Sequence, residues 1–421
     1  MTDLMEKSLQ TLEFPAVLEL LAAQAVSDET KERVRKIRPS TDRGEVNLLL
    51  QETTAARKMM DIHGAPALSN LRPVAASLQR AHLGGVLNTR ELLQIASVLR
   101  TTRNVASYSG VGEEKTCIHS IFKSLTPNKY LEEKISGAIL SEDEISDNAS
   151  AELADLRRKI RVTSGKAREV LQRIISSSAA KYLQEAIITQ RDGRFVVPVK
   201  AEHKGDLPGL VHDISSTGAT LFVEPMGVVQ ANNEFIELQA KEQKEIDRIL
   251  AEFSAEAAAH REDIQWDYDT LVHLDLIFAR GQLSYKMNAV RPEVRRDGAI
   301  HLRKARHPLL DPKTAVPIDI ELGDAFDTLV ITGPNTGGKT VSIKTVGLLT
   351  LMAMCGLMIP VADQSRISIF THVLADIGDE QSIEQSLSTF SAHMTNIISI
   401  LHQADAHSLV LIDELGAGTD P

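Results

Sequence analysis

Apolar residues recur near helical spacing through the first hundred residues of the chain. Leu9, Leu12, Val17 and Leu20 begin this pattern, and Pro39 interrupts it where one helix should end. The pattern predicts a helical region from residue 4 to about residue 110. Between residues 110 and 150 the periodicity is weaker, which indicates a solvated connector.

A longer apolar seam follows, with members alternately three and four positions apart. The seam consists of Leu153, Leu156, Ile160, Thr163, Ala167, Val170 and Ile174. This spacing is typical of a coiled coil. A second long helix is predicted from about Asn232 to Ala279. The first helix is rich in basic residues and the start of the second is rich in acidic ones, so we expect an antiparallel arm.

The segment between these helices, residues 186–225, has the short apolar runs and turn residues of a small sheet. The predicted strands are Ile187–Thr189, Phe195–Val199, Leu210–Ile214 and Thr220–Val223. Such a sheet at the tip of an arm would suit gripping a long ligand. The candidate phosphate contacts are Arg191, Arg194, Lys200 and Lys204. Four acidic residues in the same stretch leave open the alternative that each of these is merely solvated.

Towards the C-terminal end, the β-branched run Thr328–Thr332 predicts a buried strand. A run without charge follows from Thr345 to Ala362 and is nearly long enough to span a bilayer. It contains Gly356 and Pro360 and comes directly after a glycine-rich turn. These features favour a buried helix over a membrane span.

That turn carries the first recognisable chemistry, the pattern G-x-x-x-x-G-K-T of a phosphate loop. Its residues are Gly333, Pro334, Asn335, Thr336, Gly337, Gly338, Lys339 and Thr340. Glycines let backbone N–H groups approach phosphate oxygens, and a helix starting near Lys339 would aim its positive end at them. We therefore predict that this loop binds ATP, with Lys339 catalytic and the Thr340 hydroxyl a ligand of Mg²⁺.

A second motif supports this prediction. The apolar strand Leu409–Ile412 ends in Asp413 and Glu414, which is the Walker B pattern. Asp413 would order Mg²⁺ and its water, and Glu414 would orient or deprotonate the attacking water. An apolar run ending in acids is weak alone, but the preceding phosphate loop makes the pair specific.

Composition sets the broad class. The chain has 421 residues, 43% of them hydrophobic, and a formal net charge of -11, which argues against a generally basic nucleic-acid coat but not against a local basic face. Cys117 and Cys355 are its two cysteines, too few for a disulfide framework, so a cytoplasmic location is expected.

Three stretches together resemble the MutS superfamily of ABC-type ATPases: TGPNTGGKT, the Ser-Thr-Phe at 388–390, and LVLIDELGAGTDP. The whole chain from Thr11 resembles the second bacterial MutS type, which carries a C-terminal Smr domain. The resemblance implies a homodimeric ATPase in which Ser388 reaches the γ-phosphate bound by the partner subunit. It also implies two settings for the intact protein. One is endonucleolytic suppression of recombination on branched or double-stranded DNA, and the other is the sensing and splitting of collided ribosomes.

The resemblance has three departures. The N-terminal mismatch-reading domain of mismatch-repair relatives has no counterpart here, and the Phe-x-Glu tripeptides at Phe222 and Phe235 are interpreted as chance, so mismatch recognition is not expected. The apolar stretch Val316–Ile318 lacks the aromatic residue that often contacts adenine. The sequence stops at Pro421, soon after Walker B, and is expected to be a fragment that lacks the nuclease.

The sequence thus predicts a multidomain α plus α/β protein. We expect a helical lever domain over residues 1–150 and an antiparallel coiled-coil arm with a β clamp over 151–285. Part of an ABC-type ATPase domain is expected over 286–421. Two alternatives stay open: an SMC-like DNA-maintenance ATPase, and a scaffold that binds ATP without turnover. In SMC proteins the coiled coil lies between the two nucleotide motifs, whereas here it precedes both.

Overall fold

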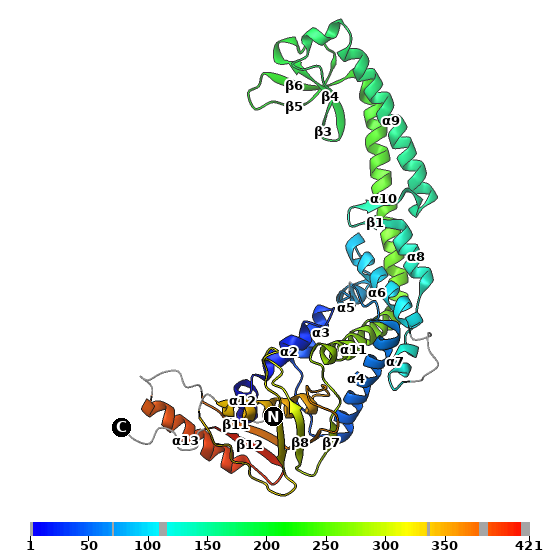
Figure 1. The fold of residues 1–421 in the computed structure, drawn as a ribbon. Helices are drawn as coiled ribbons and strands as arrows, with labels where there is room; N and C mark the ends of the chain where they lie inside the picture. Colours follow the sequence, from blue (N-terminus) through cyan, green and yellow to red (C-terminus); the bar gives the residue numbers. More distant parts are fainter. Residues whose placement is uncertain (1–2, 70, 109–115, 335–336, 379–385, 414–421) are drawn as a thin grey trace. The chain divides into compact units, whose positions relative to one another are not determined.

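A computed structural model describes residues 3–69, 71–108, 116–334, 337–378 and 386–413, except for the side chains of residues 386–392. Its internal contacts divide the chain into two units (Figure 1). Unit 1 comprises residues 1–73, 100–127 and 263–421, and unit 2 comprises residues 74–99 and 128–262. Helix α6 (Thr89–Tyr108) contributes residues to both.

Unit 1 begins with helices, as the apolar spacing predicts. They are α1 (Asp3–Thr11), α2 (Phe14–Ala22), α3 (Asp28–Arg35) and α4 (Arg43–His63), with the short α7 (His119–Lys123) and the long α11 (Arg261–Lys286) later in the chain. The side chains of Ser27 and Asp42 accept backbone N–H groups and cap α3 and α4. Leu12, Leu21 and Leu50 are fully buried in the core that these helices form.

The described strands of unit 1 form two sheets. One has the strand order β7-β10-β8-β9, with β7 (Glu293–Arg295), β8 (Ile300–Ala305), β9 (Ile318–Leu322) and β10 (Arg366–Ser368). The other pairs β11 (His372–Asp376) in parallel with β12 (Ser408–Ile412). Helix α13 (Ser386–Gln403) lies between these two strands in sequence. Because parallel strands need a crossover connection, α13 supplies the one that this pair requires.

The uncharged run that resembled a membrane span forms the buried helix α12 (Lys339–Met354) and the turn after it. Its residues from Thr345 onward are buried against the N-terminal helices and the sheets. None of the described helices combines the length and apolarity that crossing a membrane would need.

The strand predicted at Thr328–Thr332 is wrong. That segment is irregular, and Leu329 and Val330 are 43% and 77% exposed. Among the described residues no backbone hydrogen bond joins it to another segment. A β-branched run becomes a strand only where a neighbouring strand supplies partners for its backbone groups, and this one has no such neighbour in the described chain.

Unit 2 contains two long helices, α9 (Ala151–Ile175) and α10 (Val229–Ala259), which pack antiparallel (Figure 1). Ser150 donates to Glu245 at 2.7 Å and Arg157 to Glu242 at 2.7 Å, so residue numbers rise along one helix as they fall along the other. The predicted antiparallel pairing is therefore found, and Arg157–Glu242 is a contact of opposite charges between the two helices.

The other elements of unit 2 are short. They are α5 (Ala75–His82), α8 (Lys129–Ala138), the strands β1 (Ile139–Ser141) and β2 (Glu144–Ile145), and the 3-10 turns η1 (Asp147–Ala149), η2 (Ser178–Tyr182), η3 (Ala201–His203) and η4 (Met226–Val228).

The prediction of a single unbroken helix from Asn232 to Ala279 is wrong. The chain forms α10 and α11, which are interrupted at His260. Residues 260–263 are all charged or polar, so no apolar side chain there adds packing that would favour an unbroken helix. The division between the two units follows directly, after Glu262.

The four strands predicted in the insert are formed, with shifted ends. They are β3 (Thr189–Arg191), β4 (Arg194–Lys200), β5 (Gly209–Ile214) and β6 (Thr220–Pro225), and they pair antiparallel in the order β3-β4-β6-β5. We call them the tip sheet, because they lie at one end of the α9–α10 pair (Figure 1). Val197, Val199 and Val223 bury one face of the sheet against α9 and α10.

Candidate nucleotide and nucleic-acid sites

The phosphate-loop segment leads directly into α12, which begins at Lys339 as predicted. Gly338 precedes the helix with φ 78°, a left-handed conformation that suits glycine. The Lys339 Nζ donates to the Gly333 carbonyl at 2.6 Å, so the lysine side chain reaches back across the loop. The loop therefore places an ammonium group and the N-terminus of a 16-residue helix at one spot.

The two nucleotide motifs meet at the next residue. The Thr340 hydroxyl donates to the Asp413 carboxylate, although the two lie 73 positions apart in sequence. Close packing brings them together. A Cβ added at Gly347, two turns into α12, would meet Leu411 of β12 at 2.5 Å. A hydroxyl beside a carboxylate is an oxygen donor set of the kind that Mg²⁺ prefers, so these residues fit that ion.

A second acidic residue, Asp376, neighbours Asp413 across the pair of strands β11 and β12. Asp376 ends β11, is 6% exposed, and accepts the backbone N–H of Asp413 through its own carbonyl at 3.0 Å. Its side chain accepts from Asn396 at 2.7 Å and from His393 at 3.1 Å. Sequence reasoning did not assign a role to Asp376, His393 or Asn396. The sequence signal for Asp376 is that it follows a short apolar run, as Asp413 does.

In the tip sheet, Glu224 is a fully buried carboxylate with several donors. It accepts from Arg194 at 2.9 Å, from His212 at 2.5 Å and from Asn232 at 2.7 Å. Arg194, predicted to contact phosphate, is thus held by a buried anion, and the adjacent Arg191 pairs with Asp213 at 3.0 Å. Both arginines therefore already have anionic partners within the sheet.

The same network explains the tripeptide at 222–224. Glu224 is buried, and the half-buried Phe222 lies under the Arg191 guanidinium, 3.9 Å from its ring centroid. Neither side chain projects as a wedge, which agrees with interpreting the tripeptide as chance.

A cationic and aromatic cluster remains at the tip. The Lys200 Nζ donates to the Lys181 carbonyl at 3.2 Å, and the Lys181 ammonium lies 4.9 Å from the Tyr182 ring centroid. The Tyr182 and His203 rings are 5.0 Å apart, and the exposed Lys204 follows His203. Lysines beside a half-buried aromatic ring are the groups that meet nucleic-acid phosphates and bases.

Comparison with known proteins agrees with this arrangement. The family model described as MutS domain V matches residues 329–421, which include both nucleotide motifs. "Endonuclease MutS2" of Agathobacter rectalis is 49% identical over 420 residues, which is 99% of this chain and 53% of that relative. The chain belongs to the MutS family. "Endonuclease MutS2" of Ruminiclostridium cellulolyticum and of Acetivibrio thermocellus are 47% and 48% identical with the same coverage, so the chain spans about half the length of these MutS relatives.

Several residues of the expected MutS site lie outside the described part of the chain. They are Asn335, Thr336 and Glu414. Ser388 lies in the first turn of α13, and its side chain is also outside the description. The described site therefore consists of Gly333, Pro334, Gly337, Gly338, Lys339, Thr340 and Asp413.

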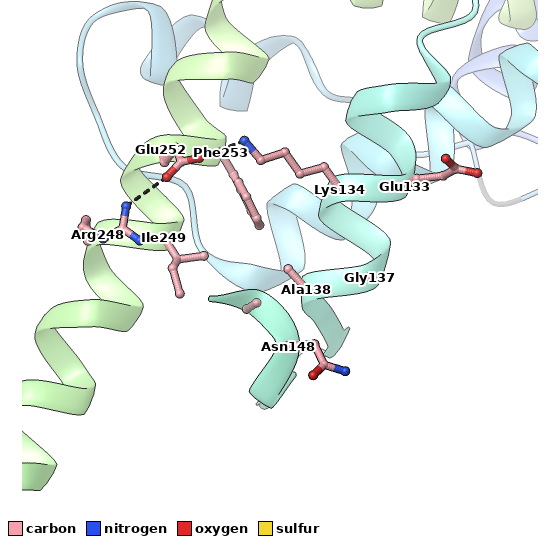
Figure 2. Close-up of a pocket in the computed structure, with 10 residues that line it drawn as sticks. Glu133, Lys134, Gly137, Ala138, Asn148, Arg248, Ile249, Glu252 and Phe253 are labelled. Carbon is pink, nitrogen blue, oxygen red and sulfur yellow. Dashed lines mark hydrogen bonds and ion pairs between the residues drawn. The ribbon is translucent and has the colours of Figure 1, made fainter. Parts of the chain in front are cut away.

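Unit 2 also has a cavity of about 380 Å³ between α8, η1 and α10 (Figure 2). Lys134 on its wall pairs with Glu252 at 2.8 Å, and Arg248 pairs with the same carboxylate at 3.0 Å (Figure 2). Arg248 also pairs with Glu245 at 2.8 Å. These cations already have anionic partners within the protein, so we assign no charged ligand to this cavity.

Proposed function

We propose that this chain binds ATP and Mg²⁺ at the phosphate loop and uses ATP hydrolysis to control a nucleic-acid grip at the tip sheet. The observation that carries the proposal is the contact between Thr340 and Asp413, since it joins the two motifs that an ATPase requires. The MutS domain V match over residues 329–421 supports the same assignment.

Each residue of the site would have a distinct role. The N–H groups of the loop and the N-terminus of α12 would hold the phosphates, and Lys339 would exchange its bond to the Gly333 carbonyl for a phosphate oxygen. Thr340 and Asp413 would hold Mg²⁺, which when bound neutralises charge that develops on the phosphates. Glu414 would orient or deprotonate the attacking water, and Ser388 would act on the nucleotide of a second subunit.

The nucleic-acid contact is assigned to the lysine cluster of the tip sheet. Lys181, Lys200 and Lys204 have no anionic partner within the described chain, whereas Arg191 and Arg194 do. A change of nucleotide state would alter the grip only if two conformations of the arm bind ATP with different affinity.

For the whole protein, the name of the relatives suggests an endonuclease. We propose that it is a homodimer acting on branched or double-stranded DNA, with the ribosome as a second candidate substrate. The SMC-like alternative is disfavoured because both nucleotide motifs follow the α9–α10 arm in sequence. A scaffold that binds ATP without turnover remains the competing function. Measurement of ATP hydrolysis distinguishes it from the proposed ATPase.

Two substitutions test this. Lys339→Ala should weaken ATP binding about ten- to hundredfold in an equilibrium titration, since it removes a charge-assisted hydrogen bond. Lys313→Ala, in an exposed loop, is the matched control and should bind like the parent. Glu414→Ala should keep ATP bound and stop hydrolysis. Unchanged ATP hydrolysis in Glu414→Ala would remove Glu414 from the mechanism. If the unsubstituted full-length protein is dimeric and shows no detectable ATP hydrolysis, the scaffold function would be favoured.

A further inference from the structure

A cavity of about 300 Å³ opens on unit 1, and none of the residues assigned to the nucleotide is among those that line it. Residues of α2, the end of α11 and the loop after β8 form it, and its wall is mainly aliphatic. The apolar lining includes Leu20, Leu283, Met287, Pro308, Leu309 and Pro360. Its size lies at the small end of the range for small-molecule pockets.

One wall of this cavity carries an arginine without a counter-ion in the described chain. The backbone N–H of Arg306 donates to the Pro360 carbonyl at 3.0 Å, which fixes the residue in the wall. Its side chain makes no hydrogen bond or ion pair within the described residues, and its Nε is buried without a partner. A partly desolvated guanidinium is costly unless an anion accompanies it.

The neighbouring ionisable groups do not supply that anion. Lys286 adds a second cation to the lining. Burial lowers the pKa of His307, so its ring is neutral at pH 7. The Asp311 carboxylate is exposed and accepts the Lys313 backbone N–H at 2.9 Å. The cavity of Figure 2 differs on this point, because Lys134 and Arg248 there already have carboxylate partners.

We propose that the Arg306 cavity binds a small amphipathic anion, an unbranched aliphatic chain that ends in a carboxylate or a phosphate. The guanidinium would hold the anionic group through paired N–H donors, which match the oxygens of both head groups. The leucine, methionine and proline side chains would cover the aliphatic chain. Among the described residues that line the cavity, none is a Phe, Tyr or Trp on which a nucleobase could stack.

Isothermal titration of this chain with octanoate, octyl phosphate and 1-octanol tests the proposal. We expect one saturable site for at least one of the two anions, with 1-octanol at least about tenfold weaker because it cannot form the charged hydrogen bonds. The anion that binds more tightly identifies the head group.

Three variants locate the binding. Arg306→Met should remove the preference for the anion over 1-octanol, whereas Arg303→Met should retain it, because Arg303 is exposed on β8 and donates to Gln364 instead. Met287→Trp should fill the cavity and weaken all three probes, and thermal unfolding checks that each variant is folded. Absence of saturable binding by both anions, or an undiminished anion preference in folded Arg306→Met, would overturn the proposal.

Discussion

The phosphate-loop site of unit 1 and the tip sheet of unit 2 differ in the partners of their charged groups. Lys339 and Thr340 lie at the start of a helix, where Lys339 donates to the Gly333 carbonyl and Thr340 donates to Asp413. In the tip sheet, buried Glu224 accepts from three side chains at once.

This difference predicts which residues contribute to ligand binding and which contribute to the stability of the fold. Groups whose partners can be exchanged, as at the phosphate loop, can change partner when a ligand arrives, and their replacement affects the fold little. Groups that neutralise each other in a core cannot be removed singly without leaving a buried charge. We therefore expect substitutions at the tip-sheet network to change unfolding, and those at the loop or the lysine cluster to change binding.

The largest expected effect is at Glu224. Glu224→Ala removes the carboxylate that Arg194 and His212 share in the core of the sheet, so it should lower the free energy of unfolding of unit 2 by about 3–5 kcal/mol. Urea unfolding measures this. Glu202→Ala, whose side chain is 75% exposed, is the control and should change it by less than about 0.5 kcal/mol. Equal effects of the two variants would show that the network contributes no stability.

An intermediate effect is expected at the lysine cluster. Replacing Lys181, Lys200 and Lys204 by alanine should leave unfolding unchanged and weaken DNA binding. It should also reduce the slope of log affinity against log salt by about 0.9 for each phosphate that the variant no longer neutralises. Fluorescence anisotropy over a salt series measures the slope. Lys129→Ala is the control, since this exposed lysine lies on α8 and pairs with Glu133 at 3.4 Å. The same slope in the triple variant as in the parent would place the nucleic acid elsewhere.

The smallest expected effect is a pH dependence within the arm. Hydrogen bonds from Arg248, and then from Ser150, lower the pKa of Glu245 from 4.5 to about 2. Because the folded pKa is the lower one, this stabilisation is complete above about pH 4.5 and is lost as the pH falls towards 2. It should amount to about 1 kcal/mol or less, since Arg248 is 54% exposed.

Glu245→Gln should therefore flatten the fall in unfolding free energy between pH 5 and pH 3, measured by urea denaturation at fixed salt. An equally steep fall in the variant would assign the acid sensitivity to other carboxylates.

The sequence predicted the two regions with different success, for physical reasons. Periodicity located α9, the start of α10 and the tip-sheet strands, because alternation and turn residues are local signals. The run 328–332 has the same local signal but lacks a strand partner in the described chain, which no local pattern reveals. The two nucleotide motifs singled out Lys339, Thr340 and Asp413 from residue types alone. The contact between Thr340 and Asp413 is found, and the roles of these residues towards ATP stay predictions.

Two other long-range contacts could not be predicted from the sequence. Asp376 joins the nucleotide region only because β11 pairs with β12, and Arg194 is removed from the phosphate contacts only because Glu224 is buried beside it. Both facts depend on residues distant in sequence, and spacing along one element carries no information about them.

The most direct test of the central claim is the Mg²⁺ dependence of ATP affinity in the parent and in Asp413→Asn. Equilibrium titration with and without Mg²⁺ should show tighter binding with the ion in the parent. In Asp413→Asn this gain should disappear, while the affinity measured without Mg²⁺ stays within about twofold of the parent. A full Mg²⁺-dependent gain in folded Asp413→Asn would contradict the account, because the contact between Thr340 and Asp413 would then not mark the metal position.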